Sequence, residues 1–174
     1  LQALGGQVIN QVLNSTSTQI DVQTENKILG AWLNKQYSES RVNIHPQPVR
    51  TFLAGSNKLY DLIWASLEGA LPFGYTGTDV LNEVNLETVE GLKDSLLHLN
   101  QSGWLIFHRY IYLPPRAELR LVATLNEAMR ELGWEPAHHL AIFRTISTMI
   151  FLVSKQKWQD EFSSLIQKYC DKMG

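Results

Sequence analysis

Apolar residues recur at helical spacing along most of this chain, and the most regular run follows Asn85. Residues Leu86, Val89, Leu92, Leu96 and Leu99 stand at steps of 3, 3, 4 and 3. Such steps place apolar side chains on one face of a helix. The pattern therefore predicts a helix over residues 85–99, with Asn85 as its N-cap and with its leucine-rich face turned into a core.

Similar spacing predicts further helices on both sides of this run. Thr24 is the expected N-cap of the second of them. Gly133 is expected to end the helix that precedes it. The further helices are predicted over residues 3–13, 24–37, 59–67, 79–84, 118–132, 137–153 and 158–169.

One segment, residues 104–113, has the composition of a strand. It is rich in aromatic and β-branched residues, and it contains neither proline nor glycine. Pro114 and Pro115 follow it directly and are expected to end the strand. Alternating residues of a strand face opposite sides, so one side would be aromatic. We expect the C-terminal helices of the same chain to cover that aromatic side.

The order of these elements predicts a mainly α fold with a small β component. Helix, short helix, longer helix, tight turn and strand over about residues 56–113 indicate a winged-helix-like core. An all-α bundle is the alternative fold. Residues 38–48 form an irregular stretch containing Pro46 and Pro48. The predicted division is therefore an N-terminal helical arm over residues 1–48 and a body over residues 49–174.

Composition and charge restrict the possible environments and partners. The 174 residues are 44% hydrophobic, enough for a buried core, and the net charge of −2 gives no general attraction to nucleic acid. The single cysteine, Cys170, excludes an internal disulfide framework and favours a reducing, cytoplasmic setting. No run approaches the roughly 18–20 apolar residues of a membrane-spanning helix, so no membrane contact is expected.

Motifs that would carry catalysis are not found in the sequence. The glycines form neither a Gly-x-Gly-x-x-Gly nor a Walker A loop, and a Gly-x-Ser-x-Gly elbow is also missing. His138 and His139 are adjacent, so on a helix their side chains would point about 100° apart rather than toward one metal ion. No cofactor, metal or catalytic residue is predicted, and the chain is not expected to be an enzyme, although a fragment of one is a third interpretation.

The surplus of large aromatic residues favours a non-enzymatic protein-interaction or regulatory module. Tryptophan and tyrosine dominate such interfaces because they bury large areas at little entropic cost. The partner would be another protein or a second copy of the chain. The predicted interface anchors are Trp104, Tyr110, Tyr112 and Trp158.

A DNA-binding winged-helix regulator or replication protein is the alternative function. Its phosphate contacts would come from Arg109, Arg116 and Arg120, on and just after the predicted strand. The would-be recognition helix opposes this alternative. Its exposed positions are net acidic and would repel a phosphate backbone.

Overall fold

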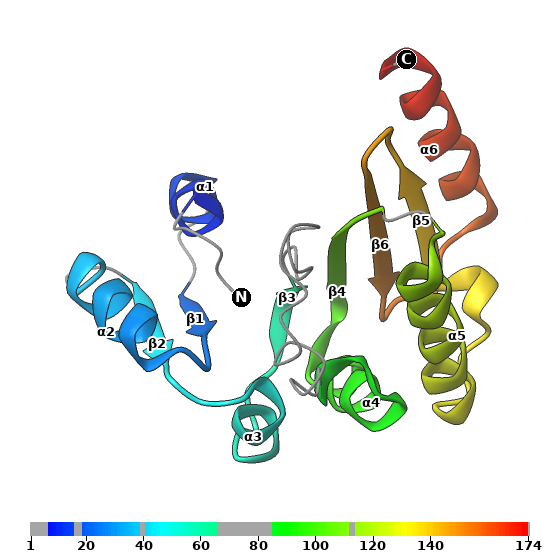
Figure 1. Ribbon diagram of the computed structural model, residues 1–174. Helices are drawn as coiled ribbons and strands as arrows, with labels where there is room; N and C mark the ends of the chain where they lie inside the picture. The colour runs from blue at the N-terminus through cyan, green and yellow to red at the C-terminus, as the bar shows by residue number, and fades with distance from the viewer. Residues whose placement is uncertain (1–6, 16–18, 39–40, 66–84, 112–113, 174) are drawn as a thin grey trace.

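A computed structural model shows an α/β fold, in which the described residues form two sheets (Figure 1). The structure describes residues 7–15, 19–38, 41–65, 85–111 and 114–173. The strands are β1 (Ile20–Gln23), β2 (Val42–His45), β3 (Tyr60–Ala65), β4 (Leu99–Tyr110), β5 (Leu140–Arg144) and β6 (Thr148–Ser154). The helices are α1 (Gln7–Ser15), α2 (Lys27–Gln36), α3 (Val49–Ala54), α4 (Val89–Leu97), α5 (Arg116–Glu131) and α6 (Asp160–Met173), with short 3-10 turns at Asn85–Glu87 and Pro136–His138.

The larger sheet has the strand order β3-β4-β6-β5. Strand β4 is parallel to β3 and antiparallel to β6, and β5 is antiparallel to β6. The register places Phe107 of β4 opposite Ala65 of β3 on one side and opposite Phe151 of β6 on the other. Strands β1 and β2 form a separate parallel pair, in which Ile20 lies opposite Val42. Figure 1 shows this pair on one side of the molecule and the larger sheet on the other.

These findings correct the prediction of a mainly α, winged-helix-like fold, and they also exclude the all-α alternative. The first error lies at residues 59–67, which were predicted to be a helix but contain β3. In so short a run, helical and extended patterns share apolar positions, and pairing with β4 decides the conformation.

The second error lies at residues 137–153, which form a 3-10 turn and then the hairpin β5–β6 rather than one helix. The chain turns between β5 and β6 at Thr145, whose N–H donates to the carbonyl oxygen of Thr148 at 2.8 Å. Ile146 at this turn is fully exposed. The segment is rich in β-branched residues, which pack well on a pleated surface, and that preference outweighed the helical spacing.

Five of the predicted helices are confirmed with adjusted ends, and the helix predicted at residues 79–84 lies outside the described residues. Helix α2 is capped by Asn26, whose side chain accepts hydrogen bonds from two backbone N–H groups, and not by Thr24. Helix α4 is capped by Thr88, while Asn85 begins a 3-10 turn. The inward face of the leucine ridge is confirmed, because Leu92, Leu96 and Leu99 are fully buried.

The predicted strand at residues 104–113 is confirmed as far as Tyr110 and begins earlier, at Leu99. Its buried side chains alternate with half-buried ones, as a pleated strand between two layers requires. Leu105 and Phe107 face the larger of two buried clusters, together with Leu125 of α5 and Phe151 of β6. This cluster joins α4 and α5 to the four-stranded sheet.

The second buried cluster lies around β1 and β2 and shares no member with the first. Its buried members are Ile9, Ile20, Val22, Leu33, Tyr37 and Val42.

The predicted division of the chain at residue 48 stays a prediction. Within the described residues, no helix is both long and apolar enough to cross a membrane.

Candidate functional site

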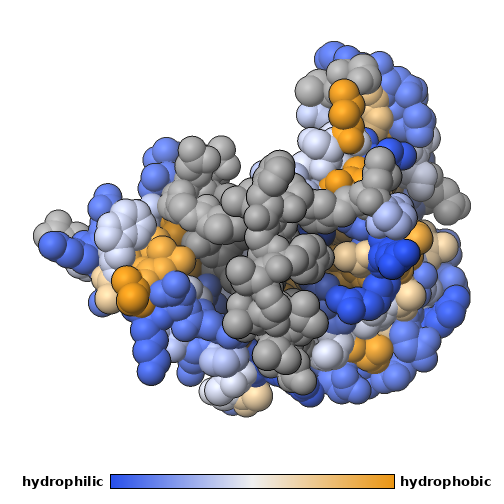
Figure 2. All heavy atoms as spheres, in the orientation of Figure 1, coloured by the Kyte–Doolittle hydropathy of each residue, from blue (hydrophilic) through white to orange (hydrophobic). Residues whose placement is uncertain are grey.

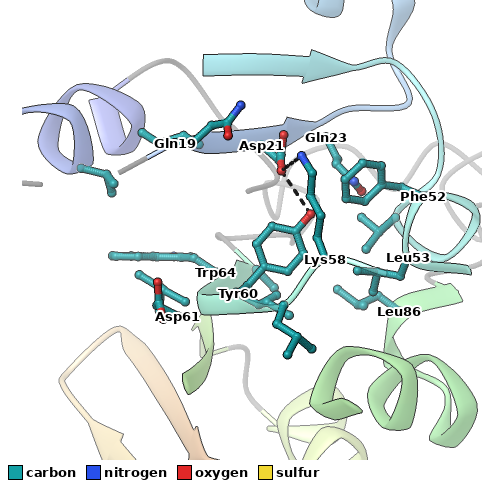
Figure 3. Close-up of a pocket in the computed structure, with 17 residues that line it drawn as sticks. Gln19, Asp21, Gln23, Phe52, Leu53, Lys58, Tyr60, Asp61, Trp64 and Leu86 are labelled. Atoms are coloured by element: carbon teal, nitrogen blue, oxygen red, sulfur yellow. Dashed lines mark hydrogen bonds and ion pairs between the residues drawn. The ribbon is translucent and has the colours of Figure 1, made fainter. Parts of the chain in front are cut away.

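A cavity of about 450 Å³ lies between β1 and β3, the facing strands of the two sheets (Figure 3). This volume falls within the roughly 300–1,000 Å³ typical of small-molecule sites. Gln19, Asp21 and Gln23 line it from β1 and the residue before it, and β3 lines the other side. Phe52 and Leu53 of α3 add apolar surface. We call this cavity the cleft.

Asp21 links the two walls of the cleft. Its Oδ1 accepts a hydrogen bond from Asn43 at 3.1 Å and lies 3.0 Å from Nε2 of His45. Its Oδ2 accepts hydrogen bonds from Nζ of Lys58 and from the hydroxyl of Tyr60, both at 3.1 Å. Asn43 pairs with Asp21 in the sheet, and His45 lies two residues further along the same face of β2. The strand pair and β3 are thus joined through one carboxylate.

Burial raises the pKa of the Asp21 carboxyl, but hydrogen bonds from His45, Lys58 and Asn43 outweigh it and lower the pKa from 3.8 to about 2. Burial, and then the negative charge of Asp21, raise the pKa of Tyr60 far above its ordinary value. The phenol therefore stays protonated and donates to a carboxylate that stays ionised.

We expect acid to weaken the fold through Asp21. A carboxyl with a lowered folded-state pKa stabilises the fold above its unfolded pKa, and this contribution is lost as the pH falls from about 4 toward 2. The contribution should be roughly 1–2 kcal/mol after allowance for solvent screening. Urea unfolding of the wild type and of Asp21→Asn between pH 2.5 and pH 6 measures it. The variant should be less stable at pH 6, with a smaller difference at pH 2.5; a constant difference would contradict the prediction.

Two buried polar atoms of the cleft have no hydrogen-bond partner among the described residues. One is the amide oxygen Oε1 of Gln23, and the other is the indole nitrogen Nε1 of Trp64. Gln23 is only 4% exposed and ends β1, while Trp64 comes from β3. A buried acceptor without a partner is unfavourable by about 1–3 kcal/mol. An acceptor and a donor on opposite walls are therefore available to a polar ligand.

Trp104, Tyr110 and Trp158, three of the four residues predicted as interface anchors, do not line the cleft. Trp104 and Trp158 stack on each other with ring centroids 6.1 Å apart, and the aromatic side of β4 is thus covered partly by its own chain. Tyr110 is 40% exposed, and Tyr112 lies outside the described residues. Their role in an interface stays a prediction.

The three arginines proposed as nucleic-acid contacts are not brought together as one set. Arg109 is buried and forms an ion pair with Glu87. Arg116 and Arg120 are exposed on α5. A contact between these residues and nucleic acid stays a prediction.

Asp21, Gln23, Tyr60 and Trp64 were not found by sequence reasoning. Ile20 and Val22 alternate with Asp21 and Gln23, which is a strand pattern, but four residues are too few to identify a strand. Lys58 and Tyr60 meet Asp21 across 37 and 39 residues of sequence. No local sequence motif indicates that these three side chains lie close together in the fold.

Comparison with known proteins identifies the fold and not the family. No known protein-family profile and no curated protein matches the sequence. Solved structures that are similar include human methyltransferase-like protein 13 in complex with SAH, at 14% identity and a TM-score of 0.61, covering 91% of this chain and 73% of that one. The N-methyltransferase NodS of Bradyrhizobium japonicum is 10% identical with a TM-score of 0.57, covering 90% of this chain and 83% of that one. A protein from Clostridium thermocellum described as an rRNA methylase is 10% identical with a TM-score of 0.58, covering 86% of this chain and 83% of that one.

The protein therefore has the Rossmann-like fold of these solved structures. The winged-helix scaffold, on which both the non-enzymatic interaction module and the DNA-binding alternative were based, is therefore wrong, and the similar solved structures are described as methyltransferases rather than as regulatory modules. The sequence lacked the glycine-rich fingerprint that usually reveals a Rossmann-like fold.

Proposed function

We propose that this protein is a methyltransferase that binds S-adenosylmethionine in the cleft between β1 and β3. The main support is the buried amide oxygen of Gln23, which has no hydrogen-bond partner among the described residues. Gln23 is one of the residues that line this cavity. Support also comes from the shared fold, one example of which was solved with SAH. In open α/β sheets, ligands bind beyond the carboxyl ends of strands, where the strand order reverses. Gln23 is the last residue of β1.

The residues of the cleft fit an adenosine-containing cofactor. The ribose hydroxyls are hydrogen-bond donors as well as acceptors, so one of them can donate to Oε1 of Gln23. Rossmann-like sites often use an aspartate or glutamate for this contact. Glutamine makes a neutral and therefore weaker hydrogen bond. The apolar surface of Phe52 and Leu53 suits the adenine ring.

Bound S-adenosylmethionine supplies an electrophilic methyl group on a sulfonium centre, and its transfer to a nucleophile leaves SAH. The chain would bind and orient the cofactor through Gln23 and Trp64. Asp21, held ionised by its hydrogen-bond donors, would place a negative charge in the cleft. A negative carboxylate attracts the positive charges of this cofactor.

Isothermal titration calorimetry with SAH tests the proposal. We expect saturable binding to the wild type and about fivefold weaker binding to Gln23→Ala, because one buried hydrogen bond contributes about 1 kcal/mol. Gln167→Ala is the matched control. Gln167 lies in α6 and, within the described part of the chain, bonds only to Asp171 one turn away, so its removal should leave the affinity unchanged.

Failure of the wild type to bind SAH at millimolar concentration would contradict the cofactor assignment. Equal affinity of the wild type and Gln23→Ala would show that SAH binds elsewhere. Transfer of a labelled methyl group from S-adenosylmethionine to an acceptor would then establish the activity itself.

We also infer a cytoplasmic location. The support is Cys170, the single cysteine of the sequence, because a chain without a disulfide framework is typical of reducing compartments. Fractionation of cells that express the protein with a tag tests this inference.

A further inference from the structure

We propose that α6 is a homodimerisation element, which pairs antiparallel with α6 of a second copy of this chain. Helix α6 carries Phe162, Leu165, Ile166 and Tyr169 on one side, at steps of 3, 1 and 3. We call these four residues the α6 stripe. The opposite side is polar and includes Gln167, which donates to Asp171 at 2.8 Å. The helix is therefore amphipathic over its whole length.

The α6 stripe is only partly covered by its own chain, with Phe162 and Ile166 half-buried. Phe162 contacts Trp158 and Trp104, with ring centroids 4.7 and 6.1 Å away. Further along, Leu165 and Tyr169 are each 64% exposed. Among the described residues, α6 contributes nothing to either buried cluster. Figure 1 shows the helix running past the end of the sheet, and Figure 2 shows hydrophobic atoms on this projecting part.

Charge decides which occupant fits the α6 stripe. At about 100° per residue, Glu161, Lys168 and Lys172 all lie along the same edge of the stripe. In an antiparallel pair, the same edges of the two helices face each other, so Glu161 of one copy meets Lys168 of the other, twice by symmetry. In a parallel pair, the edge with Glu161, Lys168 and Lys172 would instead face the other edge of the partner's stripe, which holds Ser163 and Cys170. That other edge carries no acidic residue that could pair with Lys168 or Lys172.

The size of the contact predicts a weak dimer. A helix of 14 residues is about 21 Å long. Two such helices bury less surface than a standard protein interface, so micromolar dissociation is expected. The C-terminal turns of one helix would also cover the partly exposed Phe162 of the other copy.

Sedimentation equilibrium of the whole 174-residue chain, in reducing buffer, tests the proposal. The wild type should dimerise, and Leu165→Glu should abolish the dimer. Glu161→Lys or Lys168→Glu should each weaken dimerisation about tenfold, since two attractive pairs become repulsive. The double variant Glu161→Lys/Lys168→Glu should restore the wild-type dissociation constant.

Asp171→Lys is the matched control, because it changes the charge by the same amount on the polar side and should leave the dimer intact. None of these residues belongs to a buried cluster, so the variants should keep the wild-type circular dichroism spectrum. A wild type that remains monomeric at about 500 μM would overturn the proposal. Binding of a different protein to the α6 stripe would not rescue it, because the proposed partner is a second copy of this chain. Failure of the double variant to recover dimerisation would overturn the antiparallel arrangement.

Discussion

Replacing Leu125 by alanine is expected to lower the free energy of unfolding by about 3 kcal/mol. Leu125 lies in α5, is fully buried and belongs to the cluster that joins α4 and α5 to the four-stranded sheet. Its truncation removes apolar contacts and leaves a cavity, and both effects destabilise the fold. Urea denaturation followed by circular dichroism at pH 7 measures the change.

Leu119→Ala is the control for this variant, because Leu119 lies in the same helix but is 65% exposed. It makes the same chemical change without a cavity, and alanine has a slightly better helix propensity. Its free energy of unfolding should stay within about 0.5 kcal/mol of the wild type. Similar losses for both leucines would mean that α5 turns a different face to the core.

Replacing Gly103 by alanine should lower the free energy of unfolding by about 3 kcal/mol through steric overlap. A Cβ at this position would lie 2.8 Å from the carbonyl oxygen of Tyr60 and 3.0 Å from two backbone atoms of Asn100. Backbone atoms cannot rotate away as a flexible side chain can. The register of β3 against β4 shifts at this level, between Tyr60 and Leu62, so the new methyl group would press the two strands apart.

Thermal unfolding compares this variant with Gly55→Ala. At Gly55 a Cβ would meet no heavy atom closer than 3.5 Å, and φ is −91°, which alanine adopts readily. The melting temperature of Gly55→Ala should equal or exceed that of the wild type, because alanine restricts the unfolded chain. A Gly103→Ala variant as stable as Gly55→Ala would contradict the close approach of β3 and β4.

Long helices were predictable from the sequence because their evidence is local. The ridge from Leu86 to Leu99 repeats over several turns, and the structure buries it. The strands at the ends of the chain gave no comparable signal. Strand β1 has four residues, and the apolar positions of β5 and β6 happened to match helical steps across the turn near Ile146. Period alone could not separate the two conformations there.

The cleft could not be predicted because no part of it is local. Asp21 becomes informative only when Lys58, two residues before β3, and Tyr60, the first residue of β3, reach it, and the sequence analysis took β3 for a helix. Gln23 is distinguished by a buried oxygen that has no partner in the described part of the chain, a property that exists only in the folded chain. The aromatic residues Trp104 and Trp158 attracted attention in the sequence, yet they contact each other away from this cavity.

The two buried clusters have no residue in common, so the apolar interior around β1 and β2 is not continuous with that of the four-stranded sheet. Helix α3 packs with the sheet, because Val49 lies against the larger cluster and Arg50 pairs with Asp94 of α4 at 3.6 Å. The hydrogen bonds of Lys58 and Tyr60 to Asp21 and the ring contact of His45 with Phe52 link the two units. Because residues of both units line the cleft, a ligand bound there would contact both and add a further link between them.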